Sequence, residues 1–164
     1  MTISVVLADA NILFSRTLRD YFLYAAHAGA IEIRWSQQIL DEMPRNLRMR
    51  LGLDPADTAY LEALMNDFIE YALIDVDPSD VAAVAEIKMD ARDRHVLAAA
   101  PSADADILVT DNIKHFPRSW MVEHGLELLN AGDLLVRLTE QFPDKIRAAH
   151  ALTLRFSTKS EAEV

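Results

Sequence analysis

The strongest constraint on the fold is a short apolar run at residues 4–8, SVVLA, in which polar and apolar residues do not alternate. Such runs, rich in β-branched residues, are typical of strands buried on both faces of a parallel sheet. A second run of this kind, ILVT, occupies residues 107–110. Because parallel strands need long crossover connections, the chain between the two runs should contain helices.

Three further segments, at 31–35, 73–76 and 126–129, are predicted strands. Strands that alternate with helices predict an α/β fold, in which a parallel sheet of four to five strands carries helices on both faces. We expect one domain over 1–164 with a frayed tail at about 157–164. Helices that follow from apolar spacing and capping residues are expected at 55–71, 81–87, 93–100, 132–142 and 144–156.

The two helices nearest the N-terminus carry local details that the structure can test. Asn11 is a suitable N-cap for a single helix after the first strand, with its apolar side chains on one face. Ser36 can cap the next helix, which Pro44 should kink or end because proline lacks the backbone N–H.

The chain has no Cys, which excludes disulfides and thiolate metal sites and fits a reducing compartment. Its first residues lack the features of a signal peptide, and no stretch approaches the ~20 apolar residues of a membrane span. We therefore expect a cytoplasmic protein with no membrane partner.

The formal net charge is −10, the wrong sign for a protein that grips nucleic acid through phosphate contacts. Two features weaken that objection. Basic residues gather at Arg45, Arg48 and Arg50 and again at Arg92 and Arg94. An acidic metal site would also add negative formal charge that bound cations offset.

Acidic side chains follow the two buried runs directly, Asp9 after the first and Asp111 after ILVT. Ligands of parallel sheets bind beyond the carboxyl ends of the strands. Glu42 and Asp93, with Asp90 as an alternative to Asp93, lie on predicted helices that can reach the same edge. Converging carboxylates repel one another, and a hard divalent cation relieves that repulsion. Such a centre is suited to phosphodiester hydrolysis.

The predicted site residues lie in four sequence motifs: LADANILF, SQQILDEM, DARDRHVLAAA and ADILVTDNIKHF. In residue type and order they resemble the PIN-domain family, over roughly Val5 to Phe116. The resemblance implies a three-layer α/β/α sandwich and cleavage of single-stranded RNA with Mg²⁺ or Mn²⁺. It also implies a homodimer and, as for the many VapC-type toxins of this family, an antitoxin protein as partner.

The resemblance assigns residues by position. It places the catalytic, metal-holding acids at Asp9, Glu42, Asp93 and Asp111, with support from Asn11, Asp90 and Thr110. Asn11 occupies a place where the family often has Thr or Ser. We expect the RNA backbone to contact basic residues near this edge, namely Arg45, Arg48 and Lys114.

Simpler roles exist for each of these residues taken alone. Asp9 and Asn11 could only cap a helix, and Asp111 could only form a turn. Glu42 and the arginines could be ordinary solvated helix residues. His95 and His115 are not taken as zinc ligands, because no Cys or paired His spacing accompanies them.

Two other enzyme classes place an acid after the first strand or in an acidic pocket on a parallel sheet. A haloacid-dehalogenase-like enzyme needs a second Asp where this chain has Asn11, and a response-regulator receiver needs a Lys that the predicted fifth strand lacks. The alternative that stays open is a catalytically inactive PIN-like domain that binds RNA or serves in assembly.

Overall fold

A computed structural model describes residues 2–162, with side chains for 2–156. Its centre is a five-stranded sheet in the order β3-β2-β1-β4-β5, and every strand pair is parallel. This confirms the predicted α/β fold with a parallel central sheet. The strands are β1 (Ser4–Ala8), β2 (Ile31–Ser36), β3 (Leu73–Ile74), β4 (Ile107–Val109) and β5 (Glu127–Leu129).

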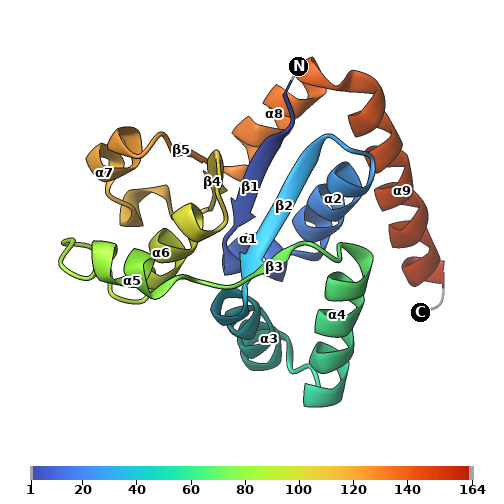
Figure 1. The fold of residues 1–164 in the computed structure, drawn as a ribbon. Helices are drawn as coiled ribbons and strands as arrows, with labels where there is room; N and C mark the ends of the chain where they lie inside the picture. Colours follow the sequence, from blue (N-terminus) through green and yellow to red (C-terminus); the bar gives the residue numbers. More distant parts are fainter. Residues whose placement is uncertain (1, 163–164) are drawn as a thin grey trace.

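Helices cover both faces of the sheet. Figure 1 shows α2 and α9 on one side of β1 and β2, with α5 and α6 on the other. Within the described residues, no helix combines the length and apolar composition that a membrane span requires. The helices are α1 (Ala10–Phe14), α2 (Arg16–His27), α3 (Gln37–Leu51), α4 (Pro55–Phe68), α5 (Pro78–Val84), α6 (Arg94–Ser102), the 3-10 turn η1 (Ile113–His115), α7 (Arg118–Glu123), α8 (Ala131–Gln141) and α9 (Pro143–Ala162).

The first helical region differs from the prediction of one helix capped by Asn11. Asp9 is the N-cap, and its side chain accepts a hydrogen bond from the Ala10 backbone N–H. The helix then breaks at Ser15, which adopts an extended conformation and caps α2 through the Leu18 N–H. Asn11 lies inside α1, so its amide is available for tertiary contacts.

The two interior prolines differ in their effect. Pro44 does not end α3, which continues to Leu51, whereas α6 ends at Ser102, one residue after Pro101. Pro44 is buried beside Leu40, Met43 and Leu47. Burial of this apolar face offsets the cost of the lost backbone hydrogen bond.

Other boundaries differ modestly. The third strand is shorter than predicted, two residues paired only with the end of β2. The short helices η1 and α7 were not predicted. The single domain and the frayed tail at 157–164 stay predictions, and residues 163–164 lie outside the described part of the chain.

The topology determines where a site can form. From β1 the chain moves outward to β2 and β3, then returns past β1 to β4 and β5. The connections from β1 and β4 therefore leave in opposite directions, which opens a crevice beyond the carboxyl ends of these two strands. Asp9 follows β1 and Thr110 follows β4, so both lie at this crevice.

Candidate active site

Asp9 is the buried centre of the crevice, with only 3% of its surface exposed. Its Oδ1 accepts a hydrogen bond of 2.7 Å from the Ala10 N–H. Its Oδ2 accepts one of 2.9 Å from the Thr110 hydroxyl and one of 3.3 Å from the Asn11 amide. A carboxylate held by three donors can remain charged at this depth.

Asn11 and Thr110 also hold the loop after β4. The Asn11 Oδ1 accepts a hydrogen bond of 3.1 Å from the Asp111 N–H. The Thr110 hydroxyl oxygen accepts one of 3.0 Å from the Asn112 N–H. The ends of β1 and β4 are therefore joined by side-chain hydrogen bonds as well as by the sheet.

Glu42 reaches the crevice from α3. Its Oε1 lies 2.5 Å from the Nε2 of His95, which belongs to the first turn of α6. This contact between residues 53 positions apart thus connects α3 and α6 at the edge of the site. The Glu42 side chain is 29% exposed, so it is accessible from the crevice.

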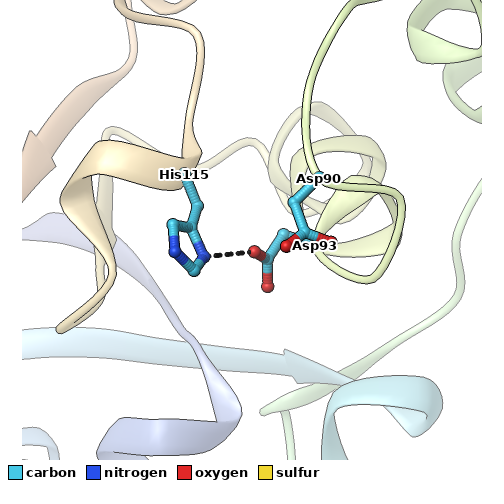
Figure 2. Close-up of side chains that lie close together, drawn as sticks. All are labelled: Asp90, Asp93 and His115. Carbon is cyan, nitrogen blue, oxygen red and sulfur yellow. Dashed lines mark hydrogen bonds and ion pairs between the residues drawn. The ribbon is translucent and has the colours of Figure 1, made fainter.

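Asp93 precedes α6, and its side chain does not cap the helix. Its Oδ2 lies 2.8 Å from the Nδ1 of His115 in η1, as Figure 2 shows. Asp90, Asp93 and His115 offer ligand atoms within 4.8 Å of one another and could hold a metal ion. Two hydrogen bonds from the Arg92 side chain and one from its backbone N–H lower the pKa of Asp90 to about 2.

Two adjoining hollows form what we call the acidic cleft. The outer hollow has a volume of about 390 Å³ and the inner one of about 140 Å³. Both are lined by Glu42, Asn46, Asp93 and Asn112. The outer hollow adds Arg45, Arg92 and His115, and the inner hollow adds Asp9, Ala10, Asn11, Phe14 and Arg50.

The charges of the acidic cleft act on one another. Burial raises the pKa of Asp9, and the hydrogen bonds from Thr110 and Ala10 oppose that rise. The negative charges of Asp93 and Glu42 raise the Asp9 pKa further. Three acids far apart in sequence therefore meet closely enough to repel, which is the condition that a divalent cation relieves.

We compared the sequence with known protein families and with characterised proteins. The sequence model of the PIN domain matches residues 5–114, more than half of the chain. The chain belongs to the PIN-domain family. It is also similar to the putative ribonuclease VapC50 of Mycobacterium tuberculosis (strain ATCC 25618 / H37Rv), with 35% identity over 57 residues. That match covers 35% of this chain and 34% of VapC50, so it spans about a third of the relative's length.

The PIN domain brings together three of the four predicted acids. Asp9, Glu42 and Asp93 line the acidic cleft, whereas Asp90 does not line it and instead bonds to Arg92. The Asp111 side chain is exposed and lines neither hollow.

Some of the predicted supporting and basic residues lie at the acidic cleft, and others do not. Asn11 and Thr110 contact Asp9 as a supporting role requires. Arg45 lines the acidic cleft. Arg48 turns away to donate a 2.9 Å hydrogen bond to Thr58, and the exposed Lys114 lines neither hollow.

Several residues of the acidic cleft were not singled out from the sequence. Asn46 lies four residues after Glu42 on α3, and this helical spacing could have identified it. Residue type favours Asp111 over Asn112, because a carboxylate is the stronger metal ligand. The partners of Glu42 and Asp93, His95 and His115, come from distant segments, and no sequence spacing links them.

The raised pKa of Asp9 predicts how the metal-free protein responds to pH. Because the folded-state pKa lies above that of the unfolded chain, the folded protein binds more protons between the two values, so stability falls as pH rises. Asp9→Asn removes this penalty. In EDTA, the wild type should lose stability relative to Asp9→Asn as the pH rises above about 4, the ordinary pKa of an aspartate.

Urea unfolding of both proteins at several pH values measures this difference. Asp144→Asn is the matched control, because the Asp144 side chain is 94% exposed. A difference between wild type and Asp9→Asn that stays constant with pH would contradict the assigned role of burial.

Proposed function

We propose that this PIN domain is an endoribonuclease that hydrolyses phosphodiesters of single-stranded RNA and depends on Mg²⁺ or Mn²⁺. The observation that carries the proposal is the convergence of Asp9, Glu42 and Asp93 on one open cleft. All three provide carboxylate oxygens, the ligand atoms that hard divalent cations prefer. Family membership and the printed name of the relative, a putative ribonuclease, support the same activity.

The side chains of the acidic cleft have different roles in the proposed reaction. Asp9, Glu42 and Asp93 would hold the cation, with a fourth oxygen from the loop after β4. When bound, the cation supplies Lewis-acid activation of the attacking water and neutralises charge on the phosphate. Asn11 and Thr110 keep Asp9 oriented through hydrogen bonds to its Oδ2. Arg45 faces the outer hollow, where it can pair with a backbone phosphate.

The alternative is an inactive PIN-like domain that binds RNA or serves in assembly. Nothing in such a role requires three mutually repelling acids, one of them buried, to be maintained at the same edge of the sheet. The convergence of the acids therefore favours catalysis. Cleavage assays separate the two functions, because an inactive domain would bind RNA without cutting it.

Cleavage by such a centre depends on both the divalent cation and the acids that hold it. EDTA should abolish cleavage of single-stranded RNA, and Mg²⁺ or Mn²⁺ should restore it. Asp9→Asn or Glu42→Gln should lower kcat/KM by roughly a hundredfold or more, because even outer-shell changes at metal sites cost about 10–100-fold. Asp144→Asn should leave cleavage unchanged. Activity that persists in EDTA would contradict the metal centre.

The same assay identifies the residue that the loop after β4 contributes. Both residues are exposed, but Asn112 lines both hollows and Asp111 lines neither, so Asn112→Ala should reduce cleavage more than Asp111→Ala. The reverse order would restore Asp111 as the fourth metal-holding residue.

RNA binding should distinguish two arginines one helical turn apart. Arg45→Ala should weaken binding of single-stranded RNA and reduce the salt dependence by about 0.7 in the logarithmic slope, the value for one lost phosphate contact. Arg48→Ala should leave that slope unchanged, because Arg48 bonds to Thr58. Titrations of catalytically inactive Asp9→Asn protein at several salt concentrations provide the measurement. Equal slopes for both variants would contradict a phosphate contact by Arg45.

We further propose that the protein is a cytoplasmic toxin controlled by an antitoxin protein, and that it forms a homodimer. Exposed apolar residues near a groove between α2 and α4, Leu64 and Phe68 among them, support a protein partner or a second copy there. Light scattering of the purified chain tests the dimer.

The toxin role predicts that expression of the wild type arrests bacterial growth. Asp9→Asn should relieve the arrest at equal protein level, because it removes the nuclease centre and leaves the surface unchanged. A neighbouring reading frame that encodes a short partner should also relieve it when co-expressed. Wild-type expression that is harmless at high level would exclude the toxin role while leaving the nuclease proposal intact.

A further inference from the structure

His95 is the more buried of the two histidines that contact acids of the cleft. Its side chain is 12% exposed, and its Nε2 lies 2.5 Å from the Glu42 Oε1. The other ring nitrogen, Nδ1, is buried and has no hydrogen-bond partner among the described residues. The imidazole is therefore bonded through one edge only.

This geometry determines where a proton can lie. A contact of 2.5 Å between Nε2 and a carboxylate oxygen requires a proton between them. Adding a second proton at Nδ1 would place an unsatisfied donor in a buried position, which is costly. The ring is thus best suited to donate from Nε2 to an ionised Glu42.

We propose that His95 is a positioning residue for the metal centre: its Nε2–H holds the Glu42 Oε1, which leaves the second carboxylate oxygen for a divalent cation. This inference rests on the proposed function, because it assumes that Glu42 holds the cation. Outer-shell partners of this kind orient metal ligands in many proteins. Here the partner acts on a carboxylate and comes from another helix, α6, which Asp93 precedes.

His115 offers an internal comparison. It also contacts an acid of the cleft, Asp93, at 2.8 Å, but its side chain is 42% exposed. Water can replace an exposed donor at little cost, whereas the buried position of the His95 ring leaves less room for a water molecule in its place. Loss of His115 should therefore affect the cation less than loss of His95.

A purely structural role is the main alternative, because the contact also links α3 to α6. The two roles differ in what they require of the side chain. A structural link depends on packing volume and on the stability it provides. A positioning role depends on a donor at the place of Nε2, whatever the effect on stability.

The experiment compares His95→Gln with His95→Asn. The Gln amide can reach the position of Nε2, whereas the Asn amide reaches only that of Nδ1, which has no partner. Mn²⁺ affinity is measured by electron paramagnetic resonance, and thermal unfolding in EDTA is recorded for each variant. His95→Asn should weaken Mn²⁺ binding by about tenfold or more, and His95→Gln should remain near wild type.

Two further measurements complete the test. His115→Ala should change Mn²⁺ affinity less than His95→Asn does. In a Glu42→Gln background, His95→Asn should produce no additional loss, because the positioned carboxylate is already absent. An additional loss of the same size would show that His95 acts independently of Glu42 and would overturn the proposal.

The outcomes distinguish this proposal from the proposed function. Equal Mn²⁺ affinity in wild type and His95→Asn overturns the role of His95 alone. Mn²⁺ binding that depends on His95, in a protein that does not cleave RNA, supports this role and contradicts the proposed nuclease function. A wild type that binds no Mn²⁺ overturns both. If His95→Asn does not fold, a folded His95→Gln that loses tenfold in affinity overturns the proposal.

Discussion

The repulsion among carboxylates at the carboxyl edge of β1 and β4 is the constraint on which this structure depends. Asp9 is buried, and the charges of Glu42 and Asp93 add to the cost of ionising it. Hydrogen bonds from Ala10, Asn11 and Thr110 hold it in place against that cost. The arrangement stores destabilisation that a bound cation would release, as expected where structure is built for a site rather than for stability alone.

The scaffold brings these acids together at the crevice between β1 and β4. The chain turns outward in opposite directions from β1 and β4, so their ends are adjacent while their following segments diverge. The helices α3 and α6 then approach the same opening, which brings Glu42 and Asp93 toward Asp9. Each acid contacts a donor from another segment, Thr110, His95 or His115, so its orientation depends on tertiary structure.

Much of the fold follows from local sequence. Continuous apolar runs predicted the two central strands, and the order of strands and helices predicted the parallel sheet. The positions of Asp9 and Asp93 were also predictable, since each lies at an element boundary. Glu42 lies inside α3 and was identified through the resemblance to the PIN-domain family. The path of the chain after Thr110 was not, because short turns set the direction of a side chain by backbone angles that residue type does not reveal. That is why Asn112, rather than Asp111, lines the cleft. Helix α3 runs through Pro44 because tertiary burial outweighs local preference.

A crystal soaked in Mn²⁺ and measured at the manganese absorption edge tests the central claim most directly. We predict an anomalous peak in the inner hollow of the acidic cleft, coordinated by oxygens of Asp9, Glu42 and Asp93. A peak coordinated by Asp90, Asp93 and His115 without Asp9 would contradict the claim that the buried acid after β1 holds the metal ion.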